Sequence, residues 1–476
     1  MESSRLPGQS EAHSNYAPDP KCARRILYVA YLYPPVGGTG FAGAQRVTKF
    51  LRYLPCAQAH VLTAHIGSYP KFVALDNTHP TPIHGERVYR TGIIDPFRML
   101  IAVKTAIKRR RAPTGPSPVV AIQSGTNGIS GKLQRAKDFL YDLFHFPDSA
   151  GPWIVPAAIR GALIVRRHHV NAIFATGMPW SGLAVGFLIS MMTRVPLVLD
   201  FRDPWIGNCF MRSKGRCLDA LEKSLERRVI RHAILVLANT EDLRADFLRR
   251  FPDLPGDHFV TLPNGYDPAD PRIAAVVSGR GSEPQHAAAT NQLTLTHAGF
   301  LYGGRDPAPL IQAIQSISGS APDACQVTFR QIGATDLGYH FEERYAREIS
   351  AGSVRIDPPM SYDRCLRELA ESDILVNFQP DTATQIPSKL YDYIMLDRPI
   401  LTIGGTSGAL ADMIRNYGFG ELFAPQEVDA IAAFLASMVA QKQVNGRLCA
   451  AYPQKERFNI ERLSRQLSET LSTCGL

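Results

Sequence analysis

The sequence predicts an α/β protein of two doubly wound, Rossmann-like domains that face each other across a deep crevice. Three observations support this prediction. The chain has 476 residues, 45% hydrophobic and 20% charged, which is typical of a globular protein too long for one ordinary core. Short apolar runs alternate with stretches of helical periodicity, as in βαβ units. Between residues 268 and 291 the composition shifts to Pro, Gly, Ser, Ala and Gln, which indicates a linker.

The first half begins with a βαβ pattern. The run RRILYVAYLYPP is short, apolar and ended by two prolines, which is typical of a buried parallel strand. A Gly-rich loop follows, and then AGAQRVTKFLRYL, whose apolar residues recur at helical spacing. A helix is also expected at about residues 181–193. The remaining strands of this half are expected at AHVLTA, NAIFATG, VPLVLDF, AILVLANT and HFVTLPNG.

The second half repeats this order of elements. A strand at QLTLTHAG precedes a helix at PLIQAIQSI, and further strands are expected at QVTFRQIG, SDILVNFQ and RPILTIGG. The first domain is therefore predicted at 24–267 and the second at 292–455. The polar residues 1–23 lack the apolar core of a signal peptide and are expected to form a flexible tail.

Charge is distributed unevenly along the chain. Residues 1–200 hold 23 Lys and Arg against 10 Asp and Glu, whereas the whole chain carries +9. A basic half favours a negatively charged binding partner, such as nucleic acid, anionic lipid or a phosphorylated substrate. Its densest cluster, at residues 108–111, fits either a solvated loop or a site for such a surface. Because no RNA-binding aromatic signature or zinc spacing accompanies it, nucleic acid is not an expected partner.

Cysteine usage indicates the redox compartment of the protein, and hydropathy indicates whether it crosses a membrane. The eight cysteines are scattered without a C-x-x-C pair, which indicates reduced thiols in a cytosolic compartment and no metal site. The most apolar stretch, residues 172–201, is interrupted by two prolines and an arginine. A membrane span of about 20 residues is therefore not expected, and membrane contact would be peripheral.

A glycine-rich loop follows the first strand. Gly38, Gly40 and Gly43 form a G-x-G-x-x-G pattern, which suggests a dinucleotide site. However, two prolines lengthen the turn, and the next strand ends at Ala64 without the acidic residue that would hold a ribose. A nicotinamide cofactor is therefore not expected. The loop either lies near a phosphate or sugar, because glycines allow close backbone approach, or serves as a connection without a ligand.

The segment LVLDFRDPW places charged residues at the end of a buried strand. Asp200, Arg202 and Asp203 would face the crevice, because ligands bind outside the carboxyl ends of such strands. Two carboxylates beside an arginine could bind a sugar hydroxyl, take up a proton or form an internal ion-pair cluster.

The segment IPSKLYDYIMLDRPIL, residues 386–401, indicates a helix start with exposed charge. Pro387 suits a first helical turn, and the hydroxyl of Ser388 can cap it. The helix terminus and Lys389 would attract phosphate, while Asp392, on the same face, would bind a ribose diol. The alternative is a surface ion pair between Lys389 and Asp392.

In this order and spacing, five segments resemble the glycosyltransferases of GT-B fold, in particular the family 4 type of bacterial surface polysaccharide assembly. They are YLYPPVGGTGFAGAQRVTKFLRYLP, PLVLDFRDPW, LPNGYD, HAGFLYGGR and IPSKLYDYIMLDRPIL. The resemblance implies an N-terminal acceptor domain, a C-terminal nucleotide-sugar domain, no metal, no cofactor beyond the donor substrate, and retention of anomeric configuration. It also implies that residues 456–476 form a closing helix that returns toward the first domain.

The resemblance assigns roles residue by residue. Asp392 matches the donor carboxylate near the ribose. Arg305, six positions after the strand-end Gly299, matches the phosphate-binding basic residue. Lys389 would sit by the diphosphate. Independently of the resemblance, Gly38 is expected near the donor, because glycines allow close backbone approach.

Three positions depart from the family pattern. Phe300 stands where an arginine is usual, Thr384 replaces the first glutamate of the E-x7-E pattern, and Arg202 occupies the place of a common histidine. Asp203 and Arg202 are the expected catalytic residues on the acceptor side.

Taken together, these features predict a hexosyltransferase-like enzyme. It would move a sugar from a nucleotide-diphosphate-sugar to a lipid-linked or polysaccharide acceptor. Its expected location is the cytoplasm, at the inner membrane face, with Arg110 and its neighbours near anionic headgroups. The alternatives are a nucleotide-sugar epimerase of the same fold and a catalytically silent GT-B scaffold.

Overall fold

The computed structural model describes residues 24–37, 42–55, 58–69, 85–95, 131–270, 291–318 and 325–476, together with residues 75, 97, 273 and 276. The side chains of residues 42–43 and 131–134 are excepted. The predicted tail at residues 1–23, Gly38, Gly40, the basic cluster at residues 108–111 and most of the predicted linker lie outside these ranges.

The N-terminal domain is built on a seven-stranded parallel sheet of order β3-β2-β1-β4-β5-β6-β7. Its strands are β1 (Arg25–Val29), β2 (Gln58–Ala64), β3 (Arg87–Thr91), β4 (Ala172–Gly177), β5 (Leu197–Phe201), β6 (Leu235–Ala238) and β7 (Phe259–Thr261). Its helices are α1 (Ala42–Tyr53), α3 (Gly131–Phe144), α4 (Ile154–His168), α5 (Ser181–Thr193), α6 (Arg216–His232) and α7 (Glu241–Arg250). Short 3-10 turns are η1 (Ile66–Ser68), η2 (Gly151–Trp153) and η3 (Gly256–His258).

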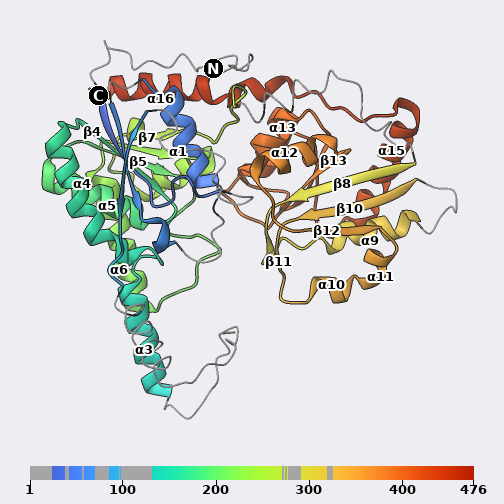
Figure 1. Ribbon diagram of the computed structural model, residues 1–476, viewed down its shortest axis with the longest axis horizontal. Coiled ribbons are helices and arrows are strands. Elements are labelled where there is room, and N and C mark those ends of the chain that lie inside the picture. The colour runs from blue at the N-terminus through green and yellow to red at the C-terminus, as the bar shows by residue number, and fades with distance from the viewer. Residues whose placement is uncertain are drawn as a thin grey trace, which may run out of the picture.

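The C-terminal domain is built on a six-stranded parallel sheet of order β12-β10-β8-β13-β14-β15. Its strands are β8 (Gln292–Ala298), β10 (Gln326–Ile332), β12 (Val354–Asp357), β13 (Ile374–Gln379), β14 (Ile400–Gly404) and β15 (Glu421–Phe423), and β9 (Leu301–Tyr302) pairs separately with β11 (Thr335–Asp336). Its helices are α9 (Ala308–Ser318), α10 (Phe341–Arg344), α11 (Ala346–Ser350), α12 (Tyr362–Glu371), α13 (Lys389–Met395), α14 (Ala409–Tyr417) and α15 (Val428–Asn445). The prediction of two doubly wound domains is confirmed (Figure 1).

Both faces of each sheet are covered, as the continuous apolar strands require. In β1, Leu27 and Val29 belong to the core cluster that contains buried residues of α4 and α5, whereas Ile26 and Tyr28 belong to the cluster that contains most of the buried residues of α1. This alternation follows from the two-residue period of a strand.

The chain ends on the N-terminal domain. After the 3-10 turn η5 (Pro453–Phe458), α16 (Ile460–Thr473) runs from the C-terminal domain along α1 (Figure 1). Its leucines join the core cluster on that side of the first sheet. The Arg24 guanidinium donates to the carbonyl oxygens of Ser468 and Leu476 at 2.8 and 3.0 Å. The two domains are therefore connected by α16 as well as by the segment after β7.

Candidate active site

Loops at the carboxyl ends of the two sheets meet between the domains. Thr240, after β6, donates its hydroxyl to the carbonyl of Thr384 at 2.8 Å. Gln385 Nε2, in the same loop after β13, donates to Asp203 Oδ1, after β5, at 2.9 Å. The rings of Phe210 and Tyr302 lie 5.6 Å apart across the same boundary. This edge is where open α/β sheets bind ligands.

The side chain of Lys389 belongs to a network on the C-terminal side. Lys389 Nζ lies 2.6 Å from His297 Nε2. His297 Nδ1 lies 2.7 Å from Gln331 Oε1, and Gln331 Nε2 donates to the carbonyl of Gly299 at 2.7 Å. An amide oxygen can only accept, so His297 carries its proton on Nδ1. Its Nε2 is then an acceptor that faces the ammonium of Lys389.

Burial and neighbouring charge shift both titratable groups of this network. Burial, and then the charge of Lys389, lowers the pKa of His297 well below its usual value. Burial, followed by the charge of Arg305, lowers the pKa of Lys389 to about 7. His297 is therefore neutral at pH 7, and Lys389 is close to half protonated. A lysine in this condition is sensitive to any anion that arrives beside it.

Gly299 allows the lysine to reach this position. Its φ is 131°, a conformation that favours glycine. A Cβ at residue 299 would lie 3.1 Å from Lys389 Nζ. The structure therefore brings together two of the predicted donor-binding residues, Gly299 and Lys389, and a side chain at residue 299 would press on the Lys389 ammonium.

Arg305 lies between aromatic rings from both domains. Its guanidinium carbon is 4.5 Å from the Tyr302 ring centroid and 5.4 Å from that of Phe210. Its Nη2 donates to Gln379 Oε1 at 3.1 Å, while its buried Nε has no hydrogen-bond partner. A cation held by rings keeps its charge available, because a ring face does not neutralise it. The charge of Arg305 acts on Lys389, on His297 and on Asp203.

Asp203 comes to the crevice from the N-terminal domain. Burial raises the pKa of its carboxyl, and Arg202, Gln385 and Arg305 oppose this rise. Arg202 itself points to the backbone: its Nε donates to the Gly177 carbonyl at 2.8 Å and its Nη2 donates to that of Met178. Burial lowers the pKa of this guanidinium. Of the two predicted catalytic residues, Asp203 therefore contacts the other domain, whereas Arg202 stabilises the backbone at the end of β4.

Of the three roles considered from the sequence, Asp200 has that of a member of an internal ion-pair cluster. Its carboxylate is fully buried and forms an ion pair with Arg46 of α1, with Arg46 Nη2 at 2.8 Å from Asp200 Oδ1. Thr176 donates to its other oxygen at 2.8 Å. Arg46 also donates to the carbonyls of Leu262 and Pro263 at 2.8 Å. This is an internal cluster that fixes α1 against the loop after β7.

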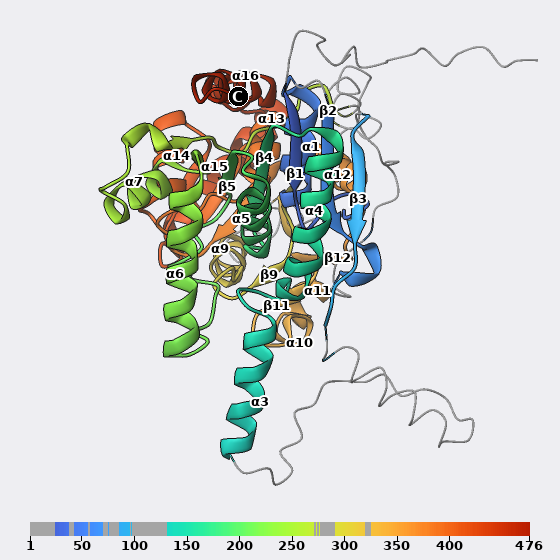
Figure 2. The ribbon, with the colours of Figure 1, turned by 90° about the vertical axis from the view of Figure 1, so that its left-hand side faces the viewer.

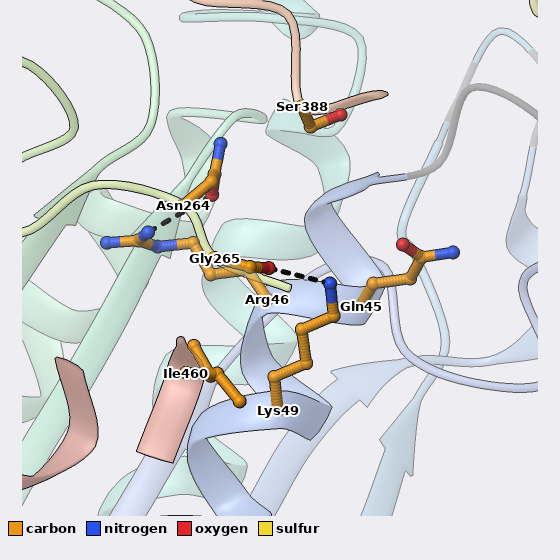
Figure 3. A pocket seen from close by; sticks show the side chains of 7 residues that line it. All are labelled: Gln45, Arg46, Lys49, Asn264, Gly265, Ser388 and Ile460. Carbon is orange, nitrogen blue, oxygen red and sulfur yellow. Dashed lines mark hydrogen bonds between the residues drawn. The ribbon is translucent and has the colours of Figure 1, made fainter. Parts of the chain in front are cut away.

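The expectations for the start of α13 need correction. The helix begins at Lys389, so Pro387 precedes the first turn, and the Ser388 hydroxyl makes no capping hydrogen bond. Ser388 has helical dihedral angles, whereas a capping side chain needs an extended residue. Instead, Ser388 lines a small pocket between the domains with residues of α1, the 264–265 loop and α16 (Figure 3).

Lys389 and Asp392 turn to different partners. Lys389 Nζ is at His297, whereas Asp392 Oδ1 lies 3.8 Å from the Nζ of Lys49 on α1. Lys49 also donates to the Gly265 carbonyl at 2.8 Å (Figure 3). The surface ion pair considered as an alternative is therefore not the arrangement seen, and Asp392 faces the N-terminal domain.

Several residues of this site were not identified from the sequence. His297, Gln331 and Gln385 have no motif of their own. His297 offered one signal, as a histidine beside the strand-end glycine in QLTLTHAG. The predicted Gly38 lies outside the described residues. Within the part of the chain that the structure describes, there is no group of three or more His, Cys, Asp or Glu that could hold a metal ion.

Comparison with known proteins places this geometry in context. Residues 107–265 match the family described as Glycosyl transferase 4-like domain. No curated protein matches the sequence. Solved structures match it along nearly the whole chain. Sucrose-phosphate synthase from Thermosynechococcus elongatus has a TM-score of 0.54 at 12% identity, covering 95% of this chain and 98% of that one.

Two further structures agree with this match. The lipopolysaccharide outer core galactosyltransferase WaaB has a TM-score of 0.51 at 11% identity, covering 94% of this chain and 99% of that one. The α,α-trehalose 6-phosphate synthase from Burkholderia multivorans has a TM-score of 0.53 at 11% identity, covering 95% and 99%. At such identities the shared property is the fold. The predicted GT-B fold is confirmed, and part of its first domain is similar to a glycosyltransferase family.

Proposed function

We propose that the protein is a glycosyltransferase that moves a hexose from a nucleotide-diphosphate-sugar to an acceptor bound against the N-terminal domain. The observation that carries the proposal is the cationic cluster of Lys389 and Arg305 at the carboxyl edge of the second sheet, opposite Asp203 of the first. The match of residues 107–265 to a glycosyl transferase 4-like domain supports the same reaction class.

The chemistry of glycosyl transfer fits this arrangement. When the anomeric C–O bond breaks, the sugar becomes positive and the departing diphosphate becomes more negative. Cations fixed beside the phosphates therefore stabilise the transition state more than the ground state. In our proposal, Lys389 and Arg305 perform this role, His297 holds Lys389 in place, and the Gly299 backbone allows the diphosphate to approach closely.

The acceptor would lie on the side of Asp203. We propose a retaining transfer, in which the acceptor hydroxyl attacks from the face that the diphosphate leaves, and the leaving phosphate oxygen takes the acceptor proton. Asp203 and Gln385 would then orient the hydroxyl, because their hydrogen bond already joins the two domains at that point. Asp392 is proposed to bind the donor ribose once Lys49 moves away from it.

We also propose a lipid-linked acceptor at the cytoplasmic membrane face, as in bacterial surface polysaccharide assembly. The support is the charge of residues 1–200 and the chemistry of the site. None of the helices in the described ranges combines the length and the apolar character of a membrane span. A UDP-sugar is the first donor to test, because the E. coli trehalose-6-phosphate structure of similar fold, at 10% identity with a TM-score of 0.55, is described as bound with UDP-2-fluoro glucose.

A donor panel tests the proposal. Thermal shifts with UDP-, GDP- and dTDP-sugars identify the donor, and release of the nucleoside diphosphate is then measured with a short-chain polyprenyl-diphosphate sugar in detergent. Lys389→Ala should reduce the rate by about 10²-fold or more. Lys455→Ala, which removes a partly exposed lysine paired with Asp397, is the matched control. Absence of binding for every donor, or equal rates in both variants, would overturn the assignment.

A further inference from the structure

One side of the N-terminal domain exposes large apolar side chains in a regular pattern. Val155, Ile159 and Leu163 of α4 are 60%, 53% and 54% exposed. They are spaced four residues apart and therefore share one helix face. Met191 and Met192, at the end of α5, are 57% and 47% exposed. We call these five residues the α4–α5 apolar face.

The two helices that carry this face lie side by side. Figure 2 shows α4 and α5 next to each other on the side of the N-terminal domain that faces away from the C-terminal domain. Arg166 Nη2 donates to the carbonyl of Met192 at 3.4 Å, so the exposed ends of α4 and α5 adjoin. The five apolar side chains therefore form one patch, in contrast to the single exposed apolar residues of an ordinary surface.

The charged side chains of the two helices have one sign. Residues 149–199 contain no Asp or Glu. Arg160, Arg166, Arg167 and Arg194 are exposed in the same two helices and directly after them. An apolar strip on two helices whose charged side chains are all arginines is complementary to an anionic lipid surface, where apolar side chains enter the acyl boundary and arginines meet the headgroups. A second copy of this face would place like charges together, which is unfavourable.

Helix α3 exposes further large apolar side chains. Phe139, Tyr141 and Phe144 are 45%, 45% and 47% exposed. Aromatic side chains of this kind are typical of membrane interfaces. Asp142 of α3 forms an ion pair with Arg212, in the loop that carries Phe210 beside Arg305. The C-terminal end of α3 is thus attached to a loop at the candidate active site.

From these observations we infer that the α4–α5 apolar face docks the protein onto an anionic lipid bilayer. The inference rests on the proposed function in one respect, since a lipid-linked acceptor is what such docking would deliver. It assigns the membrane contact to α4 and α5, which the basic cluster at residues 108–111 had been expected to make.

Flotation of the full-length protein with vesicles, in the absence of donor, tests the inference. Wild-type protein should float with phosphatidylcholine vesicles that contain 30% phosphatidylglycerol, and salt should weaken this binding. The double variant Ile159→Ser/Leu163→Ser should bind the vesicles at least about tenfold more weakly than wild type, because two side chains no longer enter the acyl boundary. Arg166→Gln/Arg167→Gln should lose binding on the order of tenfold.

Controls separate the possible outcomes. Val444→Ser alters an 84% exposed apolar residue of the C-terminal domain and should bind vesicles like wild type. Equal flotation of wild type and the Ile159/Leu163 variant, or loss of self-association in that variant by sedimentation, would overturn the inference, the latter in favour of a second copy. The thermal shift with the donor is measured in the same samples. Donor binding without flotation refutes only the docking, and flotation without donor binding refutes only the proposed function.

Discussion

The affinity for a nucleoside diphosphate should fall steeply as pH rises above 7. The perturbation is the loss of one proton from Lys389. Burial lowers the pKa of this lysine to about 7. If the diphosphate binds the ammonium form, the apparent Kd scales with the inverse of the protonated fraction. It should then rise about fivefold from pH 7 to pH 8 and about ninefold more from pH 8 to pH 9.

The direction follows from which state binds more protons. A diphosphate beside Lys389 restores the pKa toward its usual value, because an opposite charge favours the charged form. Binding above pH 7 therefore takes up a proton. The ligand adds little to this effect, since its terminal phosphate has a pKa of about 6 and is ionised throughout the range.

Isothermal titration calorimetry measures both quantities. Titrations at pH 7, 8 and 9 give the Kd, and titrations at pH 8 in two buffers of different ionisation enthalpy should give about 0.9 proton taken up per ligand. Lys389→Arg keeps its charge at every pH and should abolish the dependence, whereas Lys455→Met should preserve it. A constant Kd between pH 7 and 9, or the same loss of dependence in both variants, would refute the reasoning.

Four further predictions concern single side chains. Arg305→Ala should lower kcat/KM by about 10²–10³-fold with an unchanged melting temperature, because a charge beside the leaving group is lost; rates within twofold of wild type would contradict this. Arg46→Met should lower the free energy of unfolding in urea by about 3–5 kcal/mol, since Asp200 is left buried and uncompensated, and Arg46→Met/Asp200→Leu should recover part of it. His297→Ala should raise the donor KM about tenfold and destabilise the protein by about 1–3 kcal/mol, because a buried hydrogen-bond network is broken. Finally, because the pKa of Lys389 is lowered from 10.5 to about 7, the unfolded chain binds more protons between these values, and wild-type stability gains from this group as pH rises. Lys389→Met should therefore stabilise the unliganded protein more at pH 7 than at pH 9, and the same difference at both pH values would count against the lowered pKa.

Most of the central strands of the two sheets could be predicted from the sequence. Buried parallel strands are continuous apolar runs, and β1, β4, β5 and β13 each contain one, whereas β8 was predicted from its alternating pattern. The expected helix at residues 181–193 coincides with α5. Strand β3, RVYRT, was not predicted, because it lies at the edge of the sheet and its side chains are partly exposed. Its polar residues therefore carry little periodic signal.

The residues of the site could be predicted only where a motif marks a strand end. Gly299, Arg305, Lys389 and Asp203 follow strands, and parallel strands bring their carboxyl ends to one edge. The side chains with which these residues interact could not be predicted. The sequence indicated a capping hydroxyl at Ser388 and neighbouring charges at Lys389 and Asp392, because spacing along a helix describes only local contacts.

By itself, the sequence determined two doubly wound domains and which segments end at the crevice, because apolar periodicity and strand-end position are properties of contiguous residues. The tertiary structure alone decided what each charged side chain meets. Lys389 is paired with His297, 92 positions away, and Asp200 with Arg46, 154 positions away. Such pairs are set by strand order and by the packing of α1 and α13 against their sheets. For a buried charge, desolvation and the neighbours in space determine the pKa and the role.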